Sequence, residues 1–236
     1  MDLNKHKVIM LQILRDIYSD LELANNLGFK GGTALMFFYN LPRFSVDLDF
    51  DLICPDKEKE TVIYQKIRDI LLKYGTIEDE AQKFFGPVVV LNYGKGERKL
   101  KVEISNRRQA NQYEVKTFMG INMLVMTLAD MFANKLCTIL DRNELTNRDI
   151  FDCWFFMENR TPVNKNIVES RMKMPYPDYM QNCIDALNSL SGKSLLNGIG
   201  DLIEDNKMKT FIRNKLRNET IFLLNFYKEF PIIEVR

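Results

Sequence analysis

The chain has 236 residues and a mass of 27.7 kDa, which suffices for one large domain or two small ones with a buried core. Hydrophobic residues make up 46% and charged residues 28%, which excludes a disordered or fibrous protein, and 33 basic against 32 acidic residues exclude a polybasic nucleic-acid binder. The single histidine, His6, excludes most zinc, Ser–His and Cys–His chemistry. An enzyme of this composition works with carboxylates, lysines and arginines.

The chain shows no export or membrane signal. Its N-terminal segment is charged throughout, and no stretch is apolar enough to cross a bilayer. We therefore expect a cytoplasmic protein without a membrane partner, in which cysteines stay reduced. The four cysteines are widely spaced and are expected to be core thiols: Cys54, Cys137, Cys153 and Cys183.

Hydrophobic spacing predicts a mixed α/β first half. Helices are expected over 3–26, 33–39 and 56–74, and strands over 46–52, 76–85, 87–93, 98–105 and 112–118. After Gly120 the pattern becomes helical, over 127–141, 146–158 and most of 164–227. We therefore predict an α+β protein, with a mixed-sheet core over residues 1–122 and a helical domain over residues 123–236.

One predicted strand is strongly acidic. Asp47, Asp49 and Asp51 alternate with apolar residues, so an extended chain projects all three carboxylates from one face. Adjacent carboxylates repel one another and need either solvent or a cation beside them. Two carboxylates from one strand and a third from a neighbouring strand form the oxygen-rich site that Mg²⁺ prefers. The alternative is the solvated face of an edge strand.

The residues before this strand favour a phosphate site. Gly31 and Gly32 let a phosphate approach the backbone, and the helix that begins near Thr33 offers free N–H groups and a positive dipole end. Arg43 and Ser45 add a guanidinium and a hydroxyl close to the acids. The alternative for the glycines and for Ser45 is an ordinary turn. An anion cradle, then a cationic donor, then metal-binding carboxylates is the order expected of a site for a metal–triphosphate.

Two segments carry a family resemblance. Residues 31–35, Gly-Gly-Thr-Ala-Leu, and residues 43–50, Arg-Phe-Ser-Val-Asp-Leu-Asp-Phe, resemble the first motif of the AbiEii/AbiGii nucleotidyltransferase toxin family, whose fold is polymerase-β-like. The resemblance implies that Asp47 and Asp49 are catalytic ligands of Mg²⁺ or Mn²⁺. It implies that the nucleotide is bound by Gly31, Gly32, Thr33, Arg43 and Ser45.

The strand expected over 98–105 supplies a candidate third carboxylate. Lys99, Lys101 and Glu103 alternate with apolar residues and share one face. In nucleotidyltransferases of this fold a neighbouring strand brings the third acid, and Glu103 is the matching position, where family members often have aspartate. The resemblance implies that Glu103 binds the metal or activates the acceptor hydroxyl, with Lys101 beside the nucleotide. The alternative is a surface ion pair between Lys101 and Glu103.

Two later segments resemble the remaining family motifs, a helical lysine followed by R-D-x-x-D before aromatic residues. By that resemblance Lys135 and Asp149 join the catalytic site, with Arg148 at the nucleotide and Asp152 in support, and the helical domain forms part of the cleft. The alternative is an ion pair of Arg142 or Arg148 with Asp149 that joins two helices. The resemblance covers about residues 28–157.

The resemblance implies transfer of a nucleoside monophosphate from a nucleoside triphosphate to an acceptor hydroxyl, by the toxin of a toxin–antitoxin or abortive-infection system. The expected partners are the triphosphate, a tRNA end or a protein as acceptor, and a cognate antitoxin. Two other classes are open. A haloacid-dehalogenase-like D-x-D phosphatase is disfavoured by Asp51, and a non-catalytic RNA- or partner-binding protein on a degenerate fold is disfavoured by the intact acids.

Basic and aromatic clusters complete the sequence. If the acceptor is tRNA, Arg107, Arg108 and the stretch 207–217 are candidate phosphate contacts, although a solvated helix face is the favoured interpretation of that stretch. Three aromatic pairs are predicted to be core rather than base-stacking platforms: Phe37–Phe38, Phe84–Phe85 and Phe155–Phe156.

Overall fold

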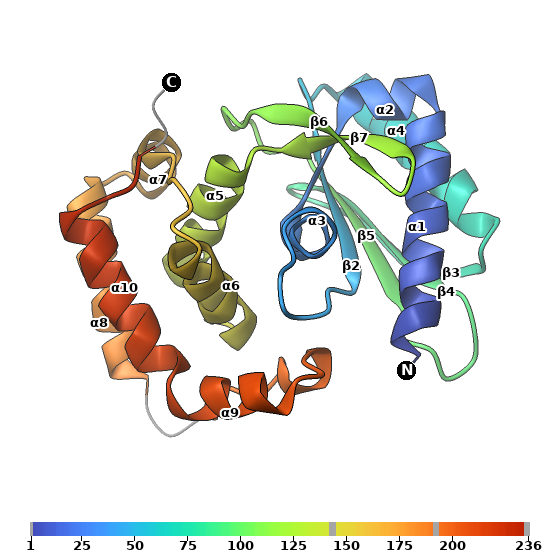
Figure 1. The fold of residues 1–236 in the computed structure, drawn as a ribbon. Coiled ribbons are helices and arrows are strands. Elements are labelled where there is room, and N and C mark those ends of the chain that lie inside the picture. Colours follow the sequence, from blue (N-terminus) through green and yellow to red (C-terminus); the bar gives the residue numbers. More distant parts are fainter. Residues whose placement is uncertain (1, 142–144, 191–193, 234–236) are drawn as a thin grey trace. The chain divides into compact units, whose positions relative to one another are not determined.

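The computed structural model describes residues 2–141, 145–190 and 194–233, so Arg142 lies outside the described residues. The chain forms two compact units, whose elements are labelled in Figure 1. Unit 1 comprises Met1–Asn40 and Phe44–Met126, and unit 2 comprises Leu41–Arg43 and Thr127–Arg236. The predicted α+β fold class is confirmed, because unit 1 holds a mixed sheet and unit 2 is helical. The assignment of Leu41–Arg43 to unit 2 has no signal in the sequence.

The seven strands of unit 1 form one sheet in the order β3-β4-β5-β2-β1-β7-β6. They are β1 (Leu27–Lys30), β2 (Asp47–Leu52), β3 (Thr76–Lys83), β4 (Gly86–Asn92), β5 (Leu100–Ser105), β6 (Tyr113–Phe118) and β7 (Ile121–Met126). The acidic strand β2 lies in the middle, parallel to β5 on one side and antiparallel to β1 on the other. The edge-strand alternative for the acidic segment is therefore wrong.

Four helices belong to unit 1: α1 (Leu3–Ser19), α2 (Leu21–Asn26), α3 (Gly31–Phe38) and α4 (Lys57–Leu72). The single helix predicted over 3–26 is divided, because the Asp20 side chain accepts hydrogen bonds from the N–H groups of Glu22 and Leu23 and so begins a new helix. Strands β1 and β7 were not predicted. Each is short, and β1 contains a glycine, which is disfavoured in strands.

The two faces of β2 differ in what they contact. Leu48 and Phe50 are fully buried, and the Phe50 ring lies 5.4 Å from the ring of Phe29 and 6.5 Å from that of Tyr18 in α1. Because side chains alternate along a strand, the carboxylates at positions 47, 49 and 51 point to the opposite face of the sheet. Burial of the apolar face therefore fixes the register that aligns the acids.

The single histidine anchors the start of β2. His6 in α1 is fully buried; its Nε2 lies 3.0 Å from the carbonyl oxygen of Val46, and its Nδ1 lies 2.6 Å from the hydroxyl of Tyr93. A carbonyl only accepts, so Nε2 carries the hydrogen and Nδ1 accepts from the tyrosine. Both ring nitrogens are thus engaged in holding the backbone before Asp47, which makes His6 a structural residue.

We expect the stability of the protein to depend on the protonation of His6. Burial lowers the pKa of His6, and repulsion from Arg98 acts in the same direction. As the pH falls below about 6.5, the unfolded chain therefore binds a proton that the folded protein resists. The free energy of unfolding, measured with urea and circular dichroism, should fall between about pH 7.5 and pH 5.5. An equal fall in a His6→Gln variant would contradict this account.

Unit 2 consists of helices. They are α5 (Leu128–Asp141), α6 (Asn147–Glu158), α7 (Lys165–Met172), α8 (Tyr176–Ser189), the 3-10 helix η1 (Gly200–Leu202), α9 (Asn206–Asn214) and α10 (Leu216–Glu229). Helices α8 and α10 lie side by side (Figure 1), and the Arg217 guanidinium in α10 donates to the carbonyl oxygen of Leu190, 2.7 Å away, after the end of α8. Arg217 thus has a structural role, whereas Arg213 and Lys215 are exposed.

Two expectations about the core are wrong. Cys54 is exposed, although the other three cysteines are buried free thiols as predicted. Phe84 and Phe85 lie at the turn between β3 and β4 with 89% and 46% of their surfaces exposed, so this pair is not core. In both cases the residue sits where a strand ends, and hydrophobicity alone does not place a turn. No helix among the described residues is long and apolar enough to cross a membrane.

Candidate active site

The pairing of β2 with β5 gathers the predicted carboxylates on one face of the sheet. The register places Asp47 beside Lys101, Asp49 beside Glu103 and Asp51 beside Ser105. Paired residues of adjacent strands point to the same face, so two acids from β2 and one from β5 lie together with one lysine. This is the juxtaposition that the alternation in both segments predicts.

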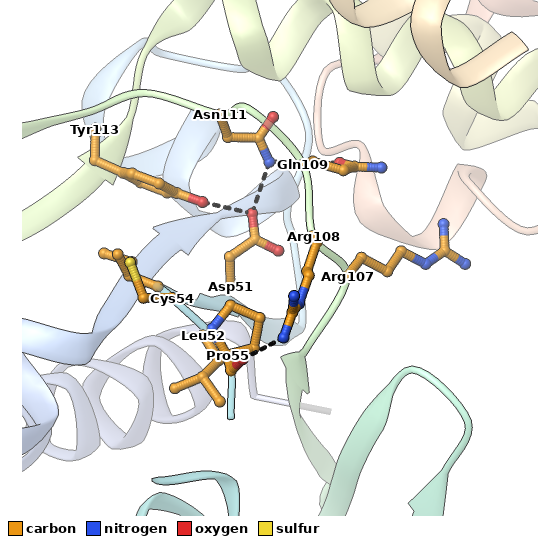
Figure 2. A pocket seen from close by; sticks show the side chains of 10 residues that line it. Asp51, Leu52, Cys54, Pro55, Arg107, Arg108, Gln109, Asn111 and Tyr113 are labelled. Atoms are coloured by element: carbon orange, nitrogen blue, oxygen red, sulfur yellow. Dashed lines mark hydrogen bonds between the residues drawn. The ribbon is translucent and has the colours of Figure 1, made fainter. Parts of the chain in front are cut away.

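Asp51 differs from the other two acids of β2, because its charge is already neutralised. Its side chain is 5% exposed and forms an ion pair with Lys30. The hydroxyl of Tyr113 donates to Oδ2 over 2.8 Å and the amide of Asn111 over 3.0 Å (Figure 2). Gly28 makes room for this arrangement, since a Cβ there would lie 2.1 Å from the Tyr113 ring. Asp51 is a structural acid.

Asp47 and Asp49, by contrast, accept no side-chain hydrogen bond from any residue that the structure describes. Burial raises the pKa of Asp49, and the nearby charges of Asp47 and Glu103 raise it further against the opposing effect of Lys101. Two adjacent carboxylates without donors are unfavourable unless a cation joins them. The pair therefore has the charge and the chemistry of a cation site.

The two carboxylates suit Mg²⁺ that is shared with a phosphate substrate. Among the described residues, no three His, Cys, Asp or Glu side chains gather closely enough to hold a metal alone. Mg²⁺ is commonly held by one or two carboxylates, with water and substrate phosphates as the other ligands. Asp47 and Asp49 fit that arrangement, in which a triphosphate completes the coordination shell.

Glu103 and Lys101 form the ion pair that was the alternative for this strand. The Lys101 ammonium lies 3.1 Å from a Glu103 carboxylate oxygen, and both side chains are partly exposed. Burial lowers the pKa of Lys101, but the charges of Asp49, Asp47 and Glu103 outweigh burial and raise it. Lys101 therefore stays protonated beside the acids and offsets part of their repulsion.

Helix α3 begins directly against Asp49. Gly31 has a φ of +80°, and a Cβ at this position would lie 2.5 Å from Oδ2 of Asp49. The buried Thr33 hydroxyl donates to the backbone carbonyl of Asp47, which ties the helix to the strand. No side chain caps α3, so backbone N–H groups at its N-terminus are available to an anion. The predicted phosphate cradle and the carboxylate pair are thus adjacent.

We expect Gly31→Ala to displace the Asp49 carboxylate as well as strain the backbone. Gly120 is the matched control, because its φ is +78° but no atom lies within 4 Å of a Cβ there. Both variants should lose about 1 kcal/mol of stability from the positive φ. Only Gly31→Ala should also lose the nucleotidyl transfer that the family resemblance implies, measured on protein that remains folded. Equal activity of the two variants would contradict the close approach.

Four of the remaining predicted residues lie in unit 2 and form a buried ionic cluster: Arg43, Lys135, Asp149 and Asp152. Arg43 donates from Nε and Nη2 to the two carboxylate oxygens of Asp152, over 2.6 Å and 2.7 Å. The Lys135 ammonium lies 3.0 Å from Asp152 and 3.1 Å from Asp149. Burial opposes charge on Asp152, but Arg43 and Lys135 outweigh it and lower its pKa. The cluster joins α5 and α6 to the segment Leu41–Arg43.

The alternative for this segment was an ion pair of Asp149 with Arg142 or Arg148; the structure shows Asp149 paired with Lys135, and Arg142 lies outside the described residues. Asp149 is buried, and its carboxylate accepts from the hydroxyl of Thr146, whose own oxygen caps α6. Arg148 is half-buried in the first turn of α6 and Ser45 is buried in unit 1. The roles of Arg43, Lys135, Arg148 and Asp149 toward a nucleotide stay predictions.

Comparisons with known proteins agree with this fold. No curated protein matches the chain in sequence. The structure of JHP933 from Helicobacter pylori is 21% identical with a TM-score of 0.54, over 96% of this chain and 95% of that one. A putative nucleotidyltransferase from H. pylori is 22% identical with a TM-score of 0.57, over 96% and 95%. MenT4, a nucleotidyltransferase toxin from Mycobacterium tuberculosis, is 20% identical with a TM-score of 0.62, over 94% and 84%. These likenesses show a shared fold.

A family model identifies the chain more specifically. The model of the nucleotidyl transferase AbiEii toxin of type IV toxin–antitoxin systems matches residues 12–221. The match spans both units and includes the glycines of α3, the acids of β2 and β5, and the ionic cluster of unit 2. The chain therefore belongs to the AbiEii nucleotidyltransferase toxin family.

Proposed function

We propose that this protein transfers a nucleoside monophosphate from a nucleoside triphosphate to an acceptor hydroxyl at a tRNA end, and that a cognate antitoxin restrains it. The observation that carries the proposal is the difference between the acids of β2. Asp51 is neutralised by three donors, whereas Asp47 and Asp49 have none among the described residues and adjoin the N-terminus of α3. An acidic pair beside an anion cradle suits a metal–triphosphate.

The residues of this site would have separate roles. Asp47 and Asp49 would hold Mg²⁺ or Mn²⁺, which when bound offsets the phosphate charge and orients the reacting groups. The backbone of Gly31 and Gly32 would receive phosphate oxygens. Lys101 stays protonated and would contact the nucleotide, while Glu103, in register with Asp49, would accept the proton of the acceptor hydroxyl.

Labelled nucleotides test this function. The protein would be incubated with tRNA, Mg²⁺ and each nucleoside triphosphate in turn, labelled with ³²P at the α- or the γ-phosphate. The proposal expects label in tRNA from the α-position alone, with release of pyrophosphate. Label from the γ-position would indicate a kinase. If α-label appears in a protein and not in tRNA, the acceptor is a protein hydroxyl instead of a tRNA end. Absence of α-label from every acceptor would overturn the proposal.

A further inference from the structure

The turn between β3 and β4 exposes two aromatic rings. Two-residue hairpin turns favour asparagine and glycine, yet here the turn residues are Phe84 and Phe85. Their rings meet edge to face with centroids 4.8 Å apart, and Phe84 is 89% exposed. The two phenylalanines are unfavourable in such a turn, and because they are exposed they add little to the core. We therefore infer that the rings serve binding.

Two arginines lie beside this turn. The backbone N–H of Asn106 donates to the carbonyl oxygen of Phe85 over 3.1 Å, which holds the turn against the segment that follows β5. The Arg107 guanidinium carbon lies 3.8 Å from the centroid of the Phe85 ring, in a stacked cation–π contact. Arg108 is exposed. We call Phe84, Phe85, Arg107 and Arg108 the aromatic–arginine platform.

A pocket continues from the platform. It has a volume of about 620 Å³, and its lining includes Arg107, Arg108, Gln109, Asn111, Tyr113 and Cys54. Figure 2 shows Asp51 among the lining residues, with Tyr113 and Asn111 pointing at its carboxylate and Arg108 pointing toward Pro55. The size lies within the usual range for small-ligand sites, in which a few polar side chains fix the orientation of the ligand. The pocket is large enough for one nucleotide.

The pocket lies on the side of the carboxylates that faces away from the phosphate cradle. Strand β1 runs antiparallel to β2 and ends with Lys30 opposite Asp49, so α3 begins at the Asp47–Asp49 end of β2. Asp51 lies two residues further along the same face, a rise of about 7 Å. In phosphoryl transfer the attacking and leaving oxygens lie on opposite sides of the phosphorus. An acceptor would therefore arrive from the Asp51 end.

We propose that the platform and the pocket bind the single-stranded 3′ end of an RNA acceptor, with bases stacked on Phe84 and one nucleotide in the pocket. Exposed aromatic rings alternating with arginines are the usual means by which proteins bind single strands, because rings stack on bases and guanidinium groups contact phosphates. The assignment of this RNA as the acceptor rests on the proposed function. Binding itself does not depend on catalysis and can be measured alone.

Binding of a 5′-fluorescent 12-nucleotide single-stranded RNA, followed by anisotropy, tests the platform. Phe84→Ser should weaken binding about tenfold without changing the dependence on salt, because it removes stacking. Arg108→Glu should also lower the slope of log affinity against log salt by about 0.7 for each phosphate that the arginine binds. The matched controls are Phe222→Ser, at a phenylalanine 66% exposed in α10, and Lys57→Glu, at an exposed lysine at the start of α4. Wild-type affinity in both platform variants would overturn the inference, as would an equal loss in the controls.

The exposed Cys54 reports on the pocket directly. It lines the pocket, whereas burial raises the pKa of the Cys137 and Cys183 thiols to about 12 and also that of Cys153, so iodoacetamide should modify Cys54 first. Single-stranded RNA should slow this alkylation several-fold, and a blunt RNA duplex should not. Protection by Mg²⁺ and a triphosphate instead of RNA would assign the pocket to the donor base and overturn the inference.

The two proposals fail separately. Alkylation and anisotropy are also run on the Asp49→Asn variant, in which catalysis is expected to be lost and RNA binding retained. If the wild type transfers α-label to no acceptor but RNA still protects Cys54, the proposed function fails while the RNA-binding surface stands. If Asp49→Asn is inactive but RNA never protects Cys54, the acceptor surface fails alone.

Discussion

Asp49→Asn and Asp47→Asn are each expected to lower nucleotidyl transfer by at least about 10³-fold, equivalent to about 4 kcal/mol of transition-state stabilisation. Neither carboxylate accepts a side-chain hydrogen bond among the described residues, and each repels the other. Removing one charge should therefore leave the melting temperature unchanged or raise it. The measurement is the initial rate of α-label incorporation at saturating triphosphate, with melting followed by circular dichroism.

Asp51→Asn is the matched control on the same strand. Its carboxylate holds Lys30, Asn111 and Tyr113, so the amide should cost about 1–3 kcal/mol of stability. Transfer by the folded fraction should persist. The assignment of Asp47 and Asp49 is contradicted if the pattern is reversed, with Asp49→Asn active but unstable and Asp51→Asn stable but inactive.

Asp152→Asn should destabilise unit 2 by about 3–5 kcal/mol, because it leaves the buried charges of Arg43 and Lys135 without their shared partner. Trp154 is the only tryptophan and packs 4.7 Å from the Phe211 ring within unit 2, so its fluorescence reports on this unit. Urea unfolding followed by this fluorescence gives the change in free energy.

The exposed pair between Lys73 and Asp16 provides the comparison for that cluster. It spans 3.2 Å, with the Lys73 side chain 62% exposed, and Asp16→Asn should change stability by about 1 kcal/mol or less. An Asp152→Asn effect of that small size would show that water reaches the cluster. Such a small effect would favour the interpretation that Lys135 binds a nucleotide, and not that it holds α5 to α6.

Elements with a clear hydrophobic period were predictable from the sequence. The alternation of β2 and the stripe of α5 give bounds within two residues of those in the structure. Strands β1 and β7 lack this signal, because β1 is four residues long and β7 is nearly continuously apolar. The division of 3–26 at Asp20 depends on one capping side chain, and that residue also fits a helix surface.

The site was predictable where its residues share a strand. Asp47 and Asp49 follow from alternation, and Glu103 follows from the same pattern on β5. What distinguishes Asp51 is not local, because its donors lie 21 to 62 residues away in the chain. The bidentate pair of Arg43 with Asp152 spans 109 residues, so only the folded chain shows that this arginine is already engaged.

Calorimetric titration of Mg²⁺ with a non-hydrolysable triphosphate analogue tests the central claim, that Asp47 and Asp49 bind the metal–triphosphate and Asp51 does not. It is performed on the wild type, Asp49→Asn and Asp51→Asn below their melting temperatures, with and without the metal. The account predicts that Mg²⁺ strengthens binding in the wild type and in Asp51→Asn, and has no such effect in Asp49→Asn. Undiminished Mg²⁺-dependent binding by Asp49→Asn would contradict it.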